Sequence, residues 1–327
     1  MTKRVAVMFP GQGSQVVGMG TDVAKHSQAA SDVFERASKV LGYDLLELQR
    51  TGPEEKLRET QFSQPAIFVT NVALYYAVDD APTPIVSAGH SFGEFCSLTI
   101  SNALTFEEAL RIVDERGKAM QYAAEQAAGA MSAVLGMDAA AIREIVERIK
   151  SQTGGRVQLA NFNSPSQIVI SGDLAAVQAA GDALLEAGAK RVVPLNVSGA
   201  WHSQLMEPAV ERFASAVNAG HFRLPEFDVV SNVDAQPYRD VETIKRSLER
   251  SITDEVRWHD TAQRLLSYNL DLVVEFGASP VLGPLMKRLA GGLPVLNVSD
   301  YASVEKLRTA LCHPEESKDP EPVEGRK

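Results

Sequence analysis

Short apolar runs alternate with longer amphipathic stretches along most of this chain. Residues 5–9, 84–88 and 271–276 are apolar runs of the length of buried strands. Apolar side chains recur at helical spacing over residues 28–41, 64–79, 105–125 and 138–151. An alternation of strands and amphipathic helices favours a parallel sheet with helices packed against it. The pattern therefore predicts an α/β fold.

The pattern changes between residues 128 and 198. It predicts strands at 130–135, 157–162, 167–171 and 190–195, with helices at 139–150 and 174–187. The resulting order, β-α-β-β-α-β, is that of a ferredoxin-like unit. The sequence thus predicts a ferredoxin-like subdomain at 128–198, inserted into a discontinuous catalytic domain made of 1–127 and 199–312. Residues 313–327 carry three prolines and eight charges and predict a disordered tail.

Composition narrows the functional classes. The formal net charge of -10 over 327 residues argues against broad binding of nucleic acid or of an anionic membrane, because both need a basic surface. Cys96 and Cys312 are too few for a disulfide framework and suit a reducing cytosol. The five apolar residues before Pro10 are too few for a signal-peptide core, and no stretch approaches the roughly 20 apolar residues of a membrane span. We therefore expect a cytoplasmic protein.

The most informative motif is Gly89-His90-Ser91-Phe92-Gly93, which directly follows an apolar run. A G-x-S-x-G sequence between a strand and a helix is typical of a nucleophile elbow, a sharp turn that exposes the serine hydroxyl. A glycine-rich turn after a strand is more often purely structural. The motif alone therefore leaves a catalytic serine and a plain turn both open.

A second glycine loop, Pro10-Gly11-Gln12-Gly13-Ser14-Gln15, follows the first predicted strand. A dinucleotide fingerprint would require glycine or alanine at position 16, where this chain has Val16. No Gly-Lys-Ser/Thr triplet follows, so the loop is not a phosphate-binding P-loop either. It must have another use.

A serine nucleophile needs a base, and His202 is the best of the six histidines. It lies in the predicted loop that returns from the inserted subdomain, whereas His90 should project away from the attacking face of Ser91. A lone loop histidine is more often a surface residue. The remaining histidines lack recognisable partners, and no spacing suggests metal ligands: His26, His221, His259 and His313.

Arg116 is followed by Gly117 inside a predicted helix, where glycine costs about 1 kcal/mol. An ordinary surface ion pair is one explanation for this arginine. The other is a guanidinium that grips a substrate carboxylate through two parallel hydrogen bonds.

Together these motifs resemble the malonyl-CoA:acyl carrier protein transacylases, the acyltransferases of fatty-acid and polyketide synthesis. The resemblance extends over residues 4–311. Six blocks carry it, in the family's order: Phe9-Pro10-Gly11-Gln12-Gly13-Ser14-Gln15, Gln64-Pro65-Ala66, Gly89-His90-Ser91-Phe92-Gly93-Glu94, Arg116-Gly117-Lys118-Ala119-Met120, Asn161-Phe162-Asn163-Ser164-Pro165 and Gly199-Ala200-Trp201-His202-Ser203.

The resemblance implies a role for each matched position. Ser91 would be the acylated nucleophile and His202 its base. The backbone N–H groups of Gln12 and Phe92 would form the oxyanion hole, and Arg116 would bind the malonyl carboxylate. Gln64 and Trp201 would complete the substrate site. In this family a backbone carbonyl orients the histidine in place of an aspartate, and here it is expected from residues 255–258.

The implied fold is an α/β-hydrolase-like domain with a nucleophile elbow, carrying the ferredoxin-like insertion. The implied reaction needs no metal and no cofactor, takes malonyl-CoA as substrate and has acyl carrier protein as partner. Family members usually have leucine at position 92 and phenylalanine at 201. Phe92 and Trp201 are both expected to keep apolar bulk beside the acyl group, and the larger Trp201 before the histidine to disfavour a branched methylmalonyl unit.

Acyl carrier proteins are acidic, as this chain is, so docking requires a local basic patch. Lys190 and Arg191 are the expected patch, with Lys287 and Arg288 as further candidates. We expect a monomer. Three alternatives stay open: a hydrolase of acyl carrier protein thioesters, an acyltransferase for another acyl-CoA, and a non-catalytic docking module.

Overall fold

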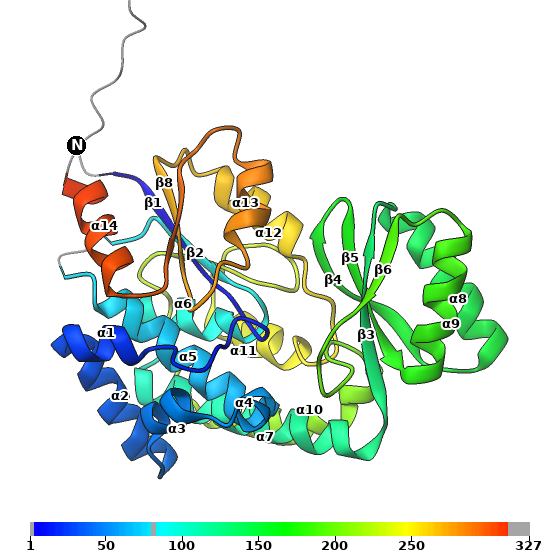
Figure 1. Cartoon of the computed structure of the whole chain (residues 1–327), viewed down its shortest axis with the longest axis horizontal. Helices are drawn as coiled ribbons and strands as arrows, with labels where there is room; N and C mark the ends of the chain where they lie inside the picture. The colour runs from blue at the N-terminus through cyan, green and yellow to red at the C-terminus, as the bar shows by residue number, and fades with distance from the viewer. Residues whose placement is uncertain (1–2, 80–82, 313–327) are drawn as a thin grey trace, which may run out of the picture.

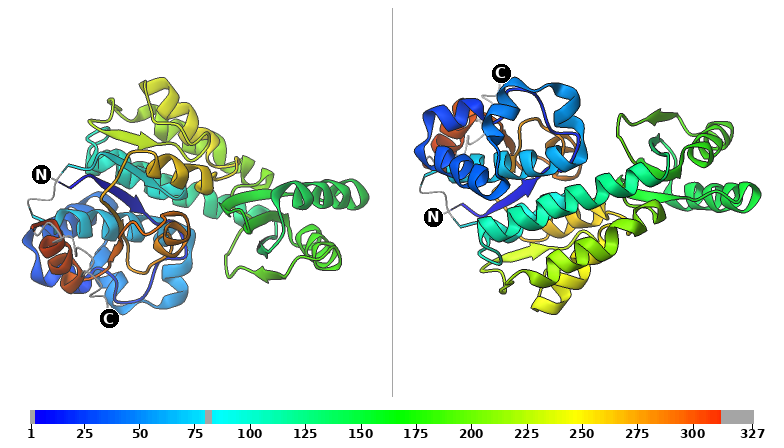
Figure 2. Two further views of the ribbon diagram at one scale, coloured as in Figure 1. Left: turned by 90° about the horizontal axis from the view of Figure 1, so that it is seen from above. Right: turned by 90° about the horizontal axis from the view of Figure 1, so that it is seen from below.

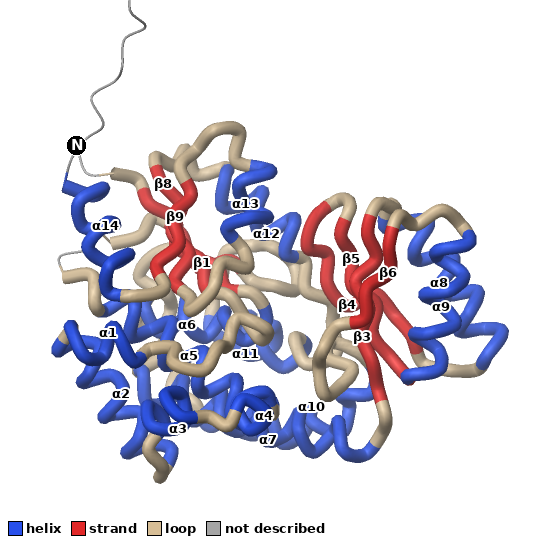
Figure 3. Tube along the Cα trace, viewed as in Figure 1, coloured by secondary structure: helices blue, strands red, loops and turns tan. Residues whose placement is uncertain are grey.

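A computed structural model describes residues 3–79 and 83–312 of the chain (Figure 1). The described residues form two β-sheets, each with its own helices, and the smaller sheet projects to one side of the larger unit (Figure 3). The predicted tail at 313–327 lies outside the described residues. No helix in the described part of the chain has the length and apolar character needed to cross a membrane.

The larger sheet is parallel throughout and has the strand order β7-β2-β1-β8-β9. Its strands are β1 (Val5–Phe9), β2 (Val86–Gly89), β7 (Asp228–Val230), β8 (Leu272–Phe276) and β9 (Val295–Val298). Every residue of β1 and β8 is buried, as the continuous apolar runs predict for strands covered on both faces.

Helices cover both faces of this sheet (Figure 2). One group shares a core with Val5, Val7 and Phe9 of β1: α1 (Thr21–His26), α2 (Gln28–Leu41), α3 (Leu45–Thr51), α4 (Glu54–Arg58), α5 (Thr60–Tyr76), α6 (Glu94–Ile100), α7 (Phe106–Gln126), α10 (Glu207–Ala219), α11 (Val241–Arg250) and α14 (Tyr301–Cys312). The alternate residues Ala6 and Met8 instead pack with α12 (Trp258–Leu266) and α13 (Gly283–Leu289). The alternation of side chains along β1 therefore builds two cores and three layers.

The smaller sheet is antiparallel and has the order β4-β5-β3-β6. Its elements are β3 (Gly129–Leu135), α8 (Ala139–Thr153), β4 (Val157–Ser164), β5 (Gln167–Asp173), α9 (Leu174–Glu186) and β6 (Arg191–Pro194). Both helices pack on one face around a separate core. The predicted α/β fold class with a ferredoxin-like unit is confirmed, while the domain boundaries at 128 and 198 stay a prediction.

The other face of the smaller sheet turns toward the larger unit. Met131, Ala133 and Val169 on that face join the larger core. At the sheet edge, the Val256 N–H donates to the Ala160 carbonyl and the Phe162 N–H to the Val256 carbonyl, both at 2.8 Å. Strand β4 is thereby hydrogen-bonded to the segment between α11 and α12, which the site described below uses.

The main difference from the predicted elements is α5. The pattern predicts its start at residue 64, beside Pro65, whereas the helix begins at Thr60. A proline inside a helix removes one donor, and the turn before it still forms because the Ser63 N–H bonds the Glu59 carbonyl at 2.8 Å. Gln64 consequently lies within the helix and not at its start.

Candidate active site

Ser91 lies on the predicted sharp turn. It follows β2 and begins a short 3₁₀-helix (Ser91–Gly93) that leads into α6. Its φ of 54° is in the left-handed region, a conformation that costs a non-glycine residue roughly 1–3 kcal/mol. A Cβ on Gly89 would lie 1.9 Å from the carbonyl carbon of Gly93, and a Cβ on Gly93 would lie 2.5 Å from the carbonyl oxygen of Phe9. Both glycines are therefore required by the close approach of the backbone.

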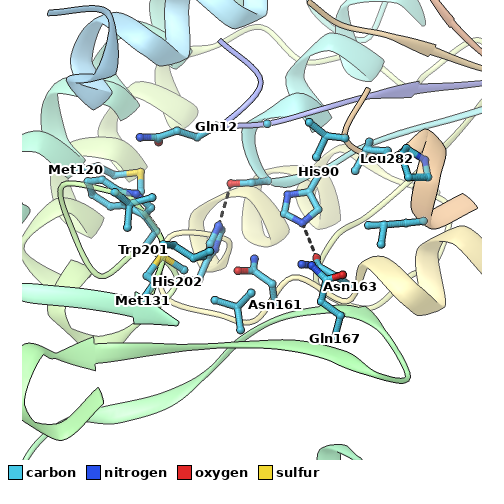
Figure 4. A pocket seen from close by; sticks show the side chains of 18 of the residues that line it. Gln12, His90, Met120, Met131, Asn161, Asn163, Gln167, Trp201, His202 and Leu282 are labelled. Carbon is cyan, nitrogen blue, oxygen red and sulfur yellow. Dashed lines mark hydrogen bonds between the residues drawn. The ribbon is translucent and has the colours of Figure 1, made fainter. Parts of the chain in front are cut away.

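His202 lies beside the Ser91 hydroxyl, with Nε2 2.9 Å from Oγ (Figure 4). It is 4% exposed and stands in the loop between β6 and α10, at a φ of 56°. Burial lowers the pKa of His202 to about 3, and the positive charge of Arg116 adds to this shift. Because only the neutral imidazole accepts a proton, His202 stays in the form of a base at neutral pH.

The second ring nitrogen of His202 is Nδ1. It is buried and makes no hydrogen bond with a described residue. The backbone carbonyls of Ser251 and Asp254 nevertheless act on this ring and raise its pKa, against the larger effect of burial. These two residues lie just before the segment 255–258, which was expected to supply the orienting carbonyl, and the identity of that carbonyl stays a prediction. Within the expected segment, the Val256 carbonyl accepts from the Phe162 N–H of β4.

Arg116 reaches the same hydroxyl from α7. The side chain is 1% exposed. Its Nη1 donates to Gln64 Oε1 at 2.8 Å and its Nη2 to Ser91 Oγ at 3.3 Å. Burial lowers the pKa of Arg116 to about 9, so the guanidinium still carries its charge at pH 7. Among the described residues its hydrogen bonds go to neutral groups, not to a carboxylate.

Gly117 explains how Arg116 reaches Gln64. A Cβ at this position would lie 2.9 Å from the Thr60 carbonyl oxygen on α5. The glycine, unfavourable for the helix itself, lets α7 and α5 approach closely. The Thr60 hydroxyl also connects the two sides of the site, because it donates to Gln12 Oε1 at 3.0 Å and accepts from Gln64 Nε2 at 2.9 Å.

The two glycine motifs meet because β1 and β2 are parallel neighbours. Phe9 pairs with Gly89, so the loop after β1 lies against the elbow, and a Cβ on Gly11 would be 2.6 Å from the His90 carbonyl oxygen. Gln12 lines the same cavity as Ser91. The Phe92 N–H is near the start of the 3₁₀-helix, where backbone donors lack helical partners.

The side chain of Phe92 departs from expectation. It is 1% exposed and packs in the larger core, and it does not contribute to the cavity wall. The expectation that its bulk lies beside the acyl group is wrong, because the turn at Ser91 directs the Phe92 side chain inward beneath the elbow. Trp201, by contrast, lines the cavity.

The cavity has a volume of about 320 Å³ and lies between the two units. Trp201, Met120 and Met131 form an apolar wall on one side of His202 (Figure 4). Asn161, Asn163 and Gln167 of the smaller sheet line the other side. At the rim, α13 contributes Leu285 and the exposed Arg288. The space is therefore built by both units and has a mixed apolar and amide surface.

Asn232 belongs to the site but lies in none of the six sequence blocks. Asn232 accepts the Ser91 N–H at 3.1 Å and donates to the Gly89 carbonyl at 2.9 Å. It also donates to the buried carboxyl of Glu94, which Tyr238 bonds as well. Burial raises the pKa of Glu94 to about 7. Asn232 is 141 positions from Ser91, and only the fold brings them together.

The other histidine of the elbow has a different neighbour. His90 bonds Asn163 Oδ1 through Nε2 at 3.1 Å and leaves the Ser91 hydroxyl to His202. Burial lowers the pKa of His90 to about 4, so it is neutral as well. No group of His, Cys, Asp and Glu side chains within residues 3–79 and 83–312 is arranged to hold a metal ion.

The residues of the expected docking patch lie at the start of β6. Lys190 and Arg191 are exposed, and Arg191 pairs with Leu135 of β3. The cavity-lining residue Leu195 is just past the other end of the same strand. Of the four basic candidates, Arg288 is the one that reaches the cavity.

Comparison with known proteins adds an independent observation. A model of the acyl transferase domain matches residues 7–311. The malonyl CoA-acyl carrier protein transacylase of Haemophilus influenzae is 39% identical over 312 residues, which cover 94% of this chain and 99% of that protein. The protein of the same name from Bacillus subtilis is 37% identical over 303 residues, covering 92% of this chain and 95% of that protein.

Solved structures agree over nearly the whole chain. The malonyl CoA-acyl carrier protein transacylase from Coxiella burnetii has a TM-score of 0.91 and 35% identity, covering 96% of this chain and 99% of that one. A malonyl-transacylase in complex with its type II PKS acyl-carrier protein has a TM-score of 0.88 and 38% identity, covering 94% of this chain and 99% of that one.

Proposed function

The chain belongs to the acyl transferase domain family, and from this premise we propose that it transfers a malonyl group from malonyl-CoA to acyl carrier protein through an ester on Ser91. The family expected from the six sequence blocks is thereby confirmed. One observation carries the chemistry: Ser91 Oγ lies 2.9 Å from His202 Nε2 and 3.3 Å from Arg116 Nη2. A nucleophile, a base and a buried cation thus meet at one oxygen atom.

In the first half-reaction, Ser91 Oγ attacks the thioester carbon of malonyl-CoA while His202 Nε2 takes the hydroxyl proton. The backbone N–H groups of Gln12 and Phe92 hold the resulting oxyanion, and losing one such donor typically costs roughly 10²–10³ in rate. The intermediate collapses with cleavage of the carbon–sulfur bond. The CoA sulfur leaves with the proton from His202, and the malonyl-serine ester remains.

Arg116 accounts for the choice of acyl group. Burying a charge is costly, and the hydrogen bonds of this guanidinium go to the neutral oxygens of Gln64 and Ser91, while Glu94 acts on it only through its charge. A malonyl group on Ser91 would bring a carboxylate to this charge, and a planar guanidinium binds a carboxylate through two parallel hydrogen bonds. A simple acyl chain offers no such partner, which disfavours the hydrolase alternative.

The second half-reaction reverses the first with a different thiol. The phosphopantetheine thiol of acyl carrier protein enters the cavity and gives its proton to His202. Its sulfur then attacks the ester, and the Ser91 oxygen leaves and recovers the proton. The reaction uses substrates carried by CoA and by the carrier protein, with no resident cofactor. The monomeric state and the cytoplasmic location stay predictions from the sequence.

Intact-mass measurement tests this function directly. After mixing with malonyl-CoA, the wild-type chain should gain the mass of one malonyl ester, and Ser91→Ala should gain none. Adding acyl carrier protein should move the mass to the carrier. Rapid loss of the ester to water, unaffected by the carrier, would favour the hydrolase. A chain that gains no mass from any acyl-CoA of a panel would contradict both enzymes.

The second prediction concerns Lys190 and Arg191 as the docking site of the carrier protein. Reversing both charges with Lys190→Glu and Arg191→Glu should weaken transfer to the acidic carrier, raising its KM on the order of tenfold, because complementary charge assists encounter. Acylation by malonyl-CoA should keep its rate, since both residues lie away from Ser91. The measurement is steady-state transfer at varied carrier concentration.

A matched control uses the same charge change on α11 of the larger unit, with Lys245→Glu and Arg246→Glu. This variant separates a specific patch from the effect of net charge. Equal losses in the two double variants, or unchanged transfer in the first, would remove the patch from the proposal. In either case Lys287 and Arg288 on α13 become the next residues to test.

A further inference from the structure

We propose that Gln158 is a positioning residue for His202, because its side-chain amide ties the backbone of the base to the loop that follows α11. The inference rests on the proposed role of His202. Gln158 stands on β4 of the smaller unit, near one end of the strand. It is absent from the cavity wall and therefore does not touch the substrate directly.

The nitrogen and the oxygen of the Gln158 side-chain amide both make hydrogen bonds. Nε2 donates to the carbonyl oxygens of His202 and Thr253, each at 3.2 Å. Oε1 accepts the N–H of Gln204, also at 3.2 Å. The three contacts agree on one orientation of the amide, with nitrogen toward carbonyls and oxygen toward an N–H. One side chain therefore holds the backbone on each side of Ser203 and a carbonyl from a loop about 50 residues further along.

His202 has particular need of such support. Its φ of 56° is unfavourable for a residue with a side chain, and such a conformation persists only where its surroundings hold it. The ring must keep Nε2 at the Ser91 hydroxyl while it stays beside the segment of Ser251 and Asp254, whose backbone raises the pKa of His202. If the loop of His202 moved relative to the loop after α11, the ring would lose one of these two positions.

Strand β4 provides the common support for both loops. Its backbone bonds Val256 through Ala160 and Phe162, at 2.8 Å each, which fixes the segment that follows Thr253. Gln158 precedes Ala160 by two residues, and the register of β4 shifts between Leu159 and Asn161. The backbone of β4 thus places the carbonyl segment, and the Gln158 amide couples that segment to His202.

The expected consequence is an error in the orientation of the base, without loss of substrate binding. Replacing Gln158 by methionine keeps the length of the side chain and removes all three hydrogen bonds. Acylation of Ser91 should slow on the order of tenfold, because a small misplacement of a catalytic group lowers the rate strongly. The KM for malonyl-CoA should stay within twofold of the wild-type value.

Two further measurements distinguish orientation of the base from general loosening. In ¹⁵N spectra of the histidines, the His202 ring of the wild type should carry its proton on Nδ1, and Gln158→Met should show a mixture of tautomers. The acid limb of kcat/KM for acylation should move from well below pH 6.5 toward pH 6.5, since water would reach a looser ring. The charged and titratable groups that act on this ring, Arg116 on α7 and His90 beside the elbow, are the same in both proteins.

Gln158→Glu provides a second variant, because a carboxylate can accept from Gln204 but cannot donate to the two carbonyls. It should behave like Gln158→Met at neutral pH. The matched control is Gln178→Met on α9, where the amide bonds the exposed Asp182. This control should match the wild type in every measurement, and thermal unfolding should show that all variants fold.

Full acylation rates in both Gln158 variants would overturn the inference. A lower rate with an unchanged tautomer and an unchanged acid limb would overturn it as well, because that result describes a structural role only. The tautomer measurement needs no substrate. It therefore tests the inference even if the chain uses an acyl donor other than malonyl-CoA.

Discussion

Replacing His202 by alanine is expected to slow acylation of Ser91 by malonyl-CoA by roughly 10²–10⁴-fold, the usual contribution of a positioned general base. The reason is the 2.9 Å contact between Nε2 and the Ser91 hydroxyl, together with a pKa lowered by burial to about 3. Without the imidazole, the hydroxyl must lose its proton to water. Single-turnover release of CoA, read alongside intact mass, measures the loss.

The backbone at His202 requires a second variant. Alanine tolerates a φ of 56° poorly, whereas asparagine enters the left-handed region more readily. His202→Asn should therefore fold normally and still lose the rate. His221→Ala is the matched control, since the His221 side chain is 90% exposed. An His202→Asn variant that acylates at the wild-type rate would exclude His202 as the base.

Replacing Arg116 by alanine is expected to lower the preference for malonyl-CoA and to raise the activity with acetyl-CoA. Malonyl transfer should fall by roughly 30- to 5000-fold, because breaking a buried, hydrogen-bonded charge pair costs about 2–5 kcal/mol. Acetyl-CoA should become a better substrate, since the variant no longer buries a cation that an acetyl group leaves unpaired. Competing the two acyl-CoA substrates and measuring the ester masses gives the ratio directly.

Two variants separate the charge from the packing. Arg116→Met retains most of the buried volume and should show the same exchange of preference. Arg212→Ala on α10 is the control, because this half-exposed arginine pairs with Glu115 next to Arg116 in the chain. Wild-type malonyl activity in Arg116→Met would remove Arg116 from the substrate site and reopen the hydrolase alternative.

The sequence predicted correctly those features that depend on interactions between residues close together in the chain. Continuous apolar runs predict β1 and β8, because strands covered on both faces expose no polar side. Apolar spacing predicts α2 with the bounds that the structure has, Gln28–Leu41. The order of elements also predicts the ferredoxin-like unit, since few topologies are open to β-α-β-β-α-β.

Prediction of the site depended on residue types with distinctive chemistry. Ser91, His202 and Arg116 each stand in a recognisable sequence block, and the structure brings their side chains together. The same reasoning placed the side chain of Phe92 beside the acyl group, whereas it packs in the larger core. This error concerns a direction in space that neighbouring residues in the sequence do not determine.

By itself the sequence determined the fold class, the family and the three side chains on which the proposed chemistry depends. Only the tertiary structure decided what supports them: the Asn232 contacts with the backbone of Ser91 and the Gln158 amide across two loops. The physical reason is that every residue carries a backbone carbonyl and an N–H. No amino-acid type marks the one that the chain, once folded, aligns with a catalytic ring.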